Sequence, residues 1–321
     1  MNLTATHLPM KELREQFGAR LQENVRLANY TAARVGGPAD ALLVVNSAGE
    51  LEKAVSTLWE LKVPFIILGS GANVLVSDEG YRGVVLLNRA HTIKIHAQTE
   101  PPTAWAESGA NLGMIARQAA LRGLSGLEWA NTVPGSLGGA IYGNAGAFGG
   151  DIQGNLLMAE ILHPIEGKQT WPVEKFSYEY RSSVLKRSGT KAVILSATLK
   201  LERSTPEAVK EKMEEFTARR KQTQPAGASL GSMFKNPPGD YAGRLIEAAG
   251  LKGLKVGGVQ VSPVHANFFV NTEDATASDY RQLIEKVRQA VLEKFGVLLE
   301  LEVELIGDWN NEDINAYGVT R

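Results

Sequence analysis

The chain has 321 residues with 34 basic and 35 acidic side chains, and a formal net charge of −1 gives no reason to expect nucleic acid or an anionic membrane as a partner. Cysteine is absent, which excludes disulfides, thiolate metal ligands and cysteine nucleophiles, and we assign no metal site. No apolar run approaches the roughly 18 residues of a membrane span, and the N-terminal segment lacks a signal-peptide core. We therefore expect a cytoplasmic protein of two or three domains.

Three helices are expected in the first part of the chain. A polar stretch over about residues 9–24 has the composition of a helical lead-in. Ser47 and Glu50 have the spacing of a capping box and predict the start of a second helix. Its apolar stripe comprises Leu51, Ala54, Val55 and Leu58. Asn111 is placed to cap a third helix, which Gly123 ends. The stripe of that helix comprises Leu112, Ile115, Ala116 and Ala119.

The second half is expected to contain two longer helices and a closing strand. Ser204 and Glu207 repeat the capping-box spacing and predict a charged helix that marks a domain boundary. Its stripe comprises Val209, Met213 and Phe216. Residues 278–295 predict a helix that stops at Gly296. Its buried residues are expected to be Tyr280, Leu283, Ile284, Val287 and Val291. In the strand predicted over 297–306, the residues Leu299, Leu301, Val303 and Leu305 alternate with Glu300, Glu302 and Glu304.

Strands are predicted between these helices, within 65–88, 159–165 and 191–201. Because helices and strands do not alternate regularly, the fold class expected is α+β. We divide the chain into residues 1–88, 89–203 and 204–307, followed by a polar tail at 308–321.

Two glycine-rich loops are the most informative local feature. The loop at 69–74 follows an apolar strand but fails the dinucleotide fingerprint, because Val74 occupies the third glycine position and no helix is expected after it. The second loop has seven glycines between Gly135 and Gly150. Successive backbone N–H groups in glycine turns bind anions, and the missing Cβ atoms allow close approach. Two such loops favour a large phosphate-bearing cofactor.

Seven motifs give the chain a family resemblance. In order they are GSGANVLVSD, VPGSLGGAIYGNAGAFGGDI, YEYRSS, GSMFKNP, AGRLIEAAGLKG, VSPVHANFFVN and LELEVELIG. Their order resembles that of the MurB family, the UDP-N-acetylenolpyruvoylglucosamine reductases, over about residues 29–307. The short spacing after the YRSS motif is similar to the compact subclass. The resemblance implies a two-part FAD-binding domain of the vanillyl-alcohol-oxidase (PCMH) type, an α+β substrate-binding domain, and a monomer.

The resemblance also implies where the cofactor binds. The residues implied are Gly69, Ser70, Gly71, Ala72, Asn73 and Val74 in the first loop, and Pro134, Gly135, Ser136, Gly139, Asn144 and Gly146 in the second. Neither loop contains His or Cys, so we expect FAD to be non-covalent. The electron donor implied is NADPH.

The implied reaction is hydride transfer from reduced FAD to UDP-N-acetylglucosamine enolpyruvate, which needs charge stabilisation and a proton donor. Arg181 and Glu302 are expected to stabilise the enolate, and Ser232 is expected to donate the proton. The residues expected to bind the UDP-sugar substrate are Tyr180, Lys221, Lys235 and Asn236. Taken alone, Glu302 fits a solvated strand face, Arg181 a surface ion pair and Ser232 a turn.

Three other functions fit parts of the pattern. Ser232 and Lys235 form the S-x-x-K tetrad of serine acyl-enzymes, but the S-D-N and K-T-G motifs that accompany it are absent. An FAD-dependent oxidase or dehydrogenase with another substrate would explain the glycine loops, as would a non-catalytic nucleotide-binding protein. Neither explains Arg181, Ser232 and Glu302 together.

Overall fold

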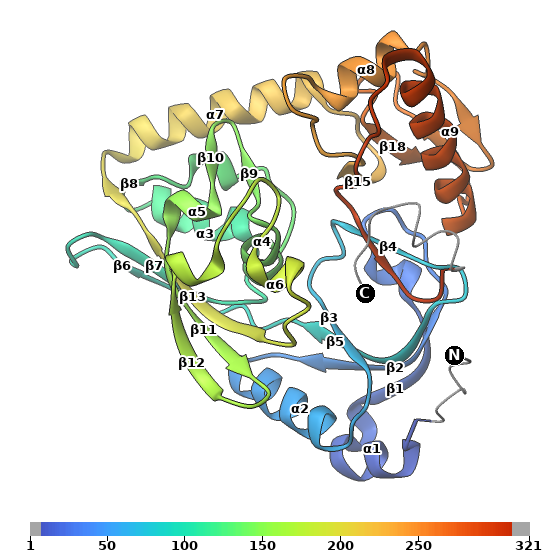
Figure 1. Ribbon diagram of the computed structural model, residues 1–321. Helices are drawn as coiled ribbons and strands as arrows, with labels where there is room; N and C mark the ends of the chain where they lie inside the picture. Colours follow the sequence, from blue (N-terminus) through green and yellow to red (C-terminus); the bar gives the residue numbers. More distant parts are fainter. Residues whose placement is uncertain (1–7, 310–321) are drawn as a thin grey trace.

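The computed structural model describes residues 8–309 and contains three groups of elements (Figure 1). The helix α7 runs along one side of the molecule from the second group to the third. Most of the tail predicted at 308–321 lies outside the described residues. Among the helices of residues 8–309, none is long and apolar enough to cross a membrane.

The first group is a four-stranded mixed sheet of order β1-β2-β5-β3. Strand β1 is antiparallel to β2, whereas β2 and β3 both run parallel to β5. The predicted stripe of α2 is fully or almost fully buried, in one cluster with alternate residues of β2 and β5 and with Leu13 and Phe17 of α1. The elements are α1 (Met10–Phe17), β1 (Leu21–Arg26), β2 (Pro38–Val45), α2 (Ala48–Glu60), β3 (Phe65–Leu68), β4 (Val74–Val76) and β5 (Tyr81–Asn88).

The single helix predicted over about 9–24 is wrong in its second half. The helix ends at Phe17, and Gly18 adopts a positive φ of 58°. Leu21 to Arg26 instead form β1 and pair with β2, with Leu21 opposite Leu43. Cross-strand hydrogen bonds therefore override the weak helical propensity of this polar stretch.

The second group is a five-stranded antiparallel sheet of order β12-β11-β13-β7-β6. Helices α3, α4 and α7 bury apolar residues in its core, and the predicted stripe of α3 is confirmed. The main elements are β6 (Ile93–His96), β7 (Thr103–Glu107), α3 (Leu112–Ala120), α4 (Leu137–Gly143), β11 (Leu156–His163), β12 (Gly167–Pro172), β13 (Val193–Lys200) and α7 (Pro206–Thr223). Shorter ones are β8 (Leu124–Ser125), β14 (Glu202–Arg203), β9 (Gly146–Ala147), β10 (Gly150–Asp151), α5 (Ile152–Asn155) and α6 (Val184–Arg187).

The predicted starts of the helices agree with the observed starts to different degrees. Asn111 caps α3 by accepting a hydrogen bond from the Met114 N–H at 2.9 Å, as expected. Ser47 caps α2, but Glu50 accepts from the N–H of Asn46 and not of Ser47. Helix α7 begins one residue later than predicted, because Thr205 is the cap and Pro206 takes the first helical position, where no N–H is needed.

The third group packs a four-stranded antiparallel sheet of order β15-β18-β17-β16 against α8 and α9. All five apolar residues predicted to be buried in the last helix are 0% exposed, which confirms that stripe. The helix ends at Gly296 (φ 68°), as expected. The elements are β15 (Ala228–Ser232), α8 (Ala242–Ala248), β16 (Lys255–Val256), β17 (Val259–Val261), β18 (Phe268–Asn271) and α9 (Ala277–Phe295).

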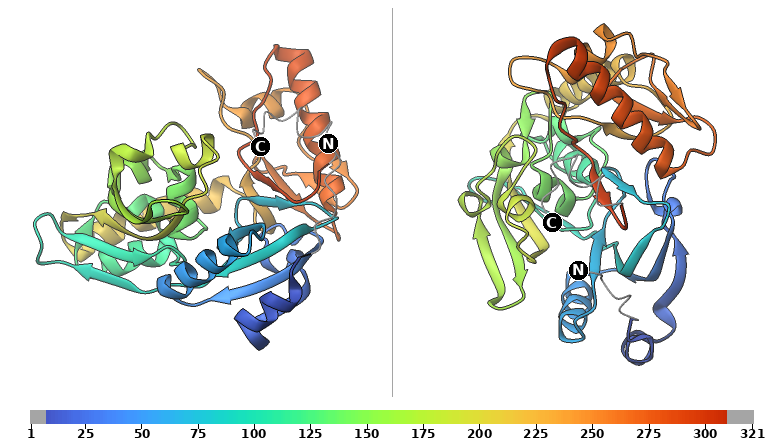
Figure 2. Two further views of the ribbon diagram at one scale, coloured as in Figure 1. Left: turned by 60° about the horizontal axis from the view of Figure 1, so that its bottom comes forward. Right: turned by 45° about the vertical axis from the view of Figure 1, so that its right-hand side comes forward.

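The closing segment returns to the first group, as both views of Figure 2 show. Strand β19 (Glu304–Ile306) pairs in parallel with β4. The continuous strand predicted over 297–306 is therefore too long, since only an isolated bridge joins Leu301 to Phe234 before β19. The alternation of burial still holds, because Leu299, Leu301 and Val303 are at most 7% exposed.

A side chain of the first group also caps a helix of the third. The carboxylate of Asp78 accepts hydrogen bonds from the N–H groups of Ala277 and Ser278, at 2.8 and 2.9 Å, and from the Ser278 hydroxyl at 2.7 Å. These N–H groups lie in the first turn of α9, where the helix dipole favours a negative charge. Asp78 therefore joins two groups of elements that are about 200 residues apart in the chain.

We predict that Asp78→Ala lowers the free energy of unfolding by about 1–2 kcal/mol, because it removes a charged cap. Urea denaturation followed by circular dichroism measures the loss. Glu79→Ala is the matched control, since Glu79 is exposed and adjacent. Equal losses in the two variants would contradict the capping role.

Candidate active site

The two glycine loops predicted to bind a cofactor lie against each other. A Cβ added to Gly69 would stand 2.3 Å from the Ser136 Oγ, so only glycine fits there. Gly71 has a φ of 63°, and a Cβ on it would stand 2.1 Å from the carbonyl oxygen of Tyr30. Ser136 caps α4 by accepting from the Gly139 N–H at 3.4 Å. Close packing of Gly69 against the Ser136 side chain thus brings the loops together.

The backbone of both loops fits a phosphate-bearing group. Within residues 8–309, the N–H groups of Ser70, Gly71, Ala72 and Asn73 donate no hydrogen bond. Unpaired N–H groups in a glycine turn form a nest for an anion. Gly135 has a φ of 141°, and a Cβ added there would meet no atom within 4 Å, which leaves an open face in the second loop.

The second loop also supports a neighbouring turn. Asn144, in the left-handed conformation at the end of α4, donates through its Nδ2 to the Glu179 carbonyl at 3.1 Å and accepts from the Gln153 N–H at 3.0 Å. Both polar groups of its side chain thus contact the protein. Pro134 and Gly139 are exposed on the same loop.

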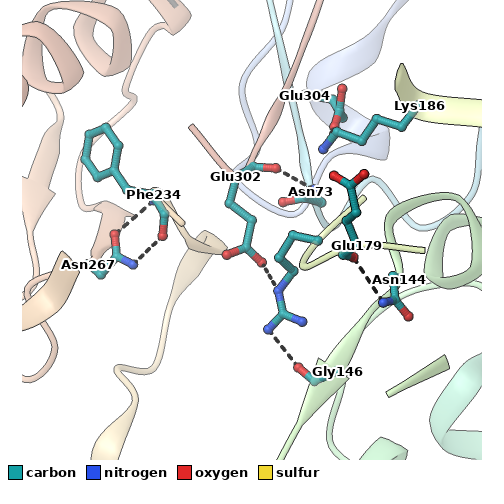
Figure 3. Close-up of polar contacts among 10 residues, drawn as sticks. Asn73, Asn144, Gly146, Glu179, Lys186, Phe234, Asn267, Glu302 and Glu304 are labelled. Carbon is teal, nitrogen blue, oxygen red and sulfur yellow. Dashed lines mark hydrogen bonds and ion pairs between the residues drawn. The ribbon is translucent and has the colours of Figure 1, made fainter. Parts of the chain in front are cut away.

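Arg181 is held in a tight turn beside this loop. Glu179 and Ser182 exchange backbone hydrogen bonds of 3.0 and 3.1 Å, and Arg181 between them has a φ of 56°. A positive φ at a residue with a long side chain is strained and is typical of functional sites. The Arg181 Nε donates to the Glu302 Oε1 at 2.8 Å, and its Nη2 donates to the Gly146 carbonyl at 2.8 Å. Figure 3 labels these two acceptor residues, Glu302 and Gly146.

Glu302 is fixed between the first loop and the third group. Its N–H donates to the Met233 carbonyl at 2.9 Å. Its carbonyl accepts from the Asn73 Nδ2 at 3.1 Å (Figure 3). Its side chain is only 18% exposed. Burial raises the pKa of Glu302, although the charges of Arg181, Lys186 and Lys235 act against this rise. A carboxyl in such a place can hold a proton and donate it in a hydrogen bond.

Ser232 ends β15 and is adjacent to the residue that binds the Glu302 backbone. It pairs with Phe268 in β18. The buried side chain of Asn267 clamps the next turn, because it accepts from the Phe234 N–H at 2.9 Å and donates to the Phe234 carbonyl at 2.8 Å. Among the described residues, the Ser232 hydroxyl has no hydrogen-bond partner. It is therefore available to a bound molecule.

The residues expected to bind the UDP-sugar lie around this cluster. Tyr180 is 53% exposed, and the Arg181 guanidinium lies 5.2 Å from its ring centroid. The Asn236 Oδ1 accepts from the Ala242 N–H at 3.1 Å, at the start of α8. Lys221 is exposed in the last turn of α7. These roles stay predictions.

The outer ion pairs of this cluster were not predicted from the sequence. Lys186 pairs with Glu304 and Lys235 pairs with Glu300, on either side of Glu302. On α7, Arg220 is half-buried beside Lys221, and burial lowers the pKa of its guanidinium. The alternation of glutamates at 300–304 was the available signal for the first two pairs, but it does not identify their partners. Within residues 8–309, no group of three or more His, Asp or Glu side chains could hold a metal.

Comparison with known proteins identifies the family. Residues 39–167, which include both glycine loops, match an FAD binding domain, and residues 222–306 match the UDP-N-acetylenolpyruvoylglucosamine reductase C-terminal domain. The reductase of Rubrobacter xylanophilus is 45% identical over 284 residues, covering 88% of this chain and 94% of that protein. The reductase of Chloroflexus aggregans is 42% identical over 297 residues, covering 92% of this chain and all of the relative.

Comparison with a solved structure identifies the same family. The crystal structure of the Thermus caldophilus UDP-N-acetylenolpyruvylglucosamine reductase (MurB) superposes with a TM-score of 0.77 at 35% identity, over 89% of this chain and 99% of that one. The α+β class, the FAD-binding fold and the resemblance drawn from the seven motifs are thereby confirmed. The chain belongs to the family of UDP-N-acetylenolpyruvoylglucosamine reductases, which are FAD-containing oxidoreductases of peptidoglycan precursor synthesis.

Proposed function

We propose that the protein uses NADPH to reduce UDP-N-acetylglucosamine enolpyruvate to UDP-N-acetylmuramate, as a cytoplasmic monomer. When bound, FAD supplies the hydride chemistry, and the protein orients and polarises the substrate. The observation that supports this best is the little-exposed Arg181–Glu302 pair, joined through Met233 to a serine with a free hydroxyl. Through this activity the protein would serve wall growth, cell shape and division.

The glycine loops are suited to hold FAD through backbone groups. The unpaired N–H groups from Ser70 to Asn73 would bind the pyrophosphate, and the open face at Gly135 would accept the flavin side of the cofactor. No His or Cys side chain lies in either loop, so the cofactor would be held without a covalent bond.

Arg181 and Glu302 would stabilise the negative charge that develops on the substrate carboxylate. The guanidinium has five N–H groups, and two hydrogen bonds within the protein leave donors for a carboxylate. A protonated Glu302 would donate a further hydrogen bond to the enolate oxygen. Ser232 would give its proton to the carbon that becomes basic.

Lys235 is better suited to binding than to activating Ser232. Its ammonium group is already engaged in an ion pair with Glu300. The acyl-enzyme suggested by the S-x-x-K spacing needs a lysine that can accept a proton. The ion pair therefore favours a role in which Lys235 and Asn236 contact the phosphates and sugar.

The overall proposal is tested by the colour of the flavin. We expect the purified holoenzyme to bleach when NADPH is added without oxygen, and to regain its absorbance near 450 nm when UDP-N-acetylglucosamine enolpyruvate follows. Failure of NADPH to bleach the enzyme would overturn the proposal. Recolouring by oxygen but not by this substrate would indicate a related oxidase with another substrate.

We predict that Ser232→Ala slows reoxidation of the reduced flavin by the substrate at least about 100-fold, because a positioned acid is lost. Reduction of the flavin by NADPH should stay near normal. Stopped-flow absorbance measures the two half-reactions separately. Ser229→Ala, on the same strand, is the control and should leave both rates unchanged. Equal loss in both half-reactions would count against a proton donor.

We predict that Arg181→Lys slows the same half-reaction about 10- to 100-fold, because a point charge cannot replace the planar fork that meets a carboxylate. Arg187→Lys is the matched control, since Arg187 lies on α6 and pairs with the exposed Glu179. Near-normal turnover of Arg181→Lys would refute the role of the fork.

A further inference from the structure

Three alternate glutamates of the closing segment each contact a different cation, and these cations come from two parts of the chain. Glu300 pairs with Lys235, which follows β15. Glu302 pairs with Arg181 from the turn before α6, and Glu304 pairs with Lys186 on α6. Figure 3 shows the Lys186–Glu304 pair to one side of the central Glu302. We refer to these three contacts as the glutamate ladder.

The two outer cations are poorly hydrated. The side chains of Lys186 and Lys235 are 18% and 16% exposed, which is less than most lysines. Charges in such positions are weakly screened and act over several ångströms. Without the outer glutamates, both lysines would stabilise the anionic form of Glu302.

The groups that face Glu302 come from every element around it. The cations are Arg181, Lys186 and Lys235, and the anions on its own segment are Glu300 and Glu304. On α4, burial raises the pKa of the Tyr142 phenol to about 12, and the nearby carboxylate of Glu304 contributes to this rise. Tyr142 is therefore uncharged near neutral pH. The charge balance at Glu302 is set by the ladder.

We propose that Glu304 and Glu300 are positioning residues that cancel the charges of Lys186 and Lys235 and so keep Glu302 protonated for the reaction. The proposal rests on the proposed function, because it assumes that Glu302 acts as a hydrogen-bond donor to the enolate. Glu304 is the better test case, since Lys235 is itself assigned to substrate binding. Glu304 acts through Lys186 and touches no reacting atom.

A double-mutant cycle that removes the charges of Lys186 and Glu304 singly and together distinguishes this role from a structural one. In Glu304→Gln, the unpaired Lys186 should lower the pKa of Glu302 by roughly 0.5–1 unit. In Lys186→Gln, the unpaired Glu304 should raise that pKa by a similar amount. The double variant, in which both charges are lost, should return the pKa close to the wild-type value. A merely structural pair would not give opposite signs.

The pKa is measured directly on the oxidised holoenzyme, without substrate. Glutamate labelled with ¹³C at the side-chain carboxyl gives the titration by NMR, and Glu302→Gln assigns the Glu302 signal. The pH dependence of flavin reoxidation by substrate is the second readout. Because the protonated form is the active one, this rate should fall as pH rises through the pKa. The fall should begin at lower pH in Glu304→Gln and at higher pH in Lys186→Gln.

Glu214→Gln is the control, because Glu214 forms an exposed pair with Lys210 on α7 and should leave the Glu302 titration unchanged. Shifts of the same sign in the two single variants, or no shift in either, would overturn the proposal. Should Glu304→Gln fold poorly, Glu300→Gln gives the same test through Lys235. If the two single variants shift the pKa of Glu302 in opposite directions but the enolpyruvyl substrate does not reoxidise the flavin, the proposed function is refuted instead.

Discussion

The backbone of Glu302 is hydrogen-bonded on two sides, to Met233 in the third group and to Asn73 in the first glycine loop. This placement forces a carboxyl group into a little-exposed position, where Arg181 from the second group can reach it. All three groups of elements thus meet at one residue. The site exists only when the closing segment has returned across the molecule to pair with β4.

Backbone and side chains have separate tasks at this junction. The glycine loops offer N–H groups and open backbone, and their glycines allow contacts such as that between Gly69 and Ser136. The charged side chains come from outside those loops. Their backbone is either strained, as the positive φ of Arg181 illustrates, or hydrogen-bonded on two sides, as at Glu302. In the proposed function, a cofactor bound mainly through backbone would leave these side chains free for the substrate.

The sequence was sufficient for elements whose partners are local. The stripe of α9, its end at Gly296 and the Asn111 cap are all set within a few residues, and each was predicted correctly. The helix expected over about residues 9–24 was not predicted correctly in its second half, because the strand at 21–26 exists only through pairing with β2. For Glu302, the alternation predicted the face of the strand on which the side chain lies. It could not show whether that face meets solvent or a residue such as Arg181, which is 121 residues away in the chain. The motif resemblance, not the pattern, selected it.

Asn73 connects the first glycine loop to the closing segment through two hydrogen bonds. Its side chain donates to the Glu302 carbonyl, and its own carbonyl accepts from the Glu304 N–H at 2.9 Å, so the loop with the unpaired N–H groups is bonded directly to the acidic segment. An anion bound by this loop would also stabilise the docked closing segment. By thermodynamic reciprocity, docking of that segment raises the affinity of the loop for the anion by the same factor. If this loop holds FAD as proposed, cofactor loading and completion of the substrate site would be coupled equilibria.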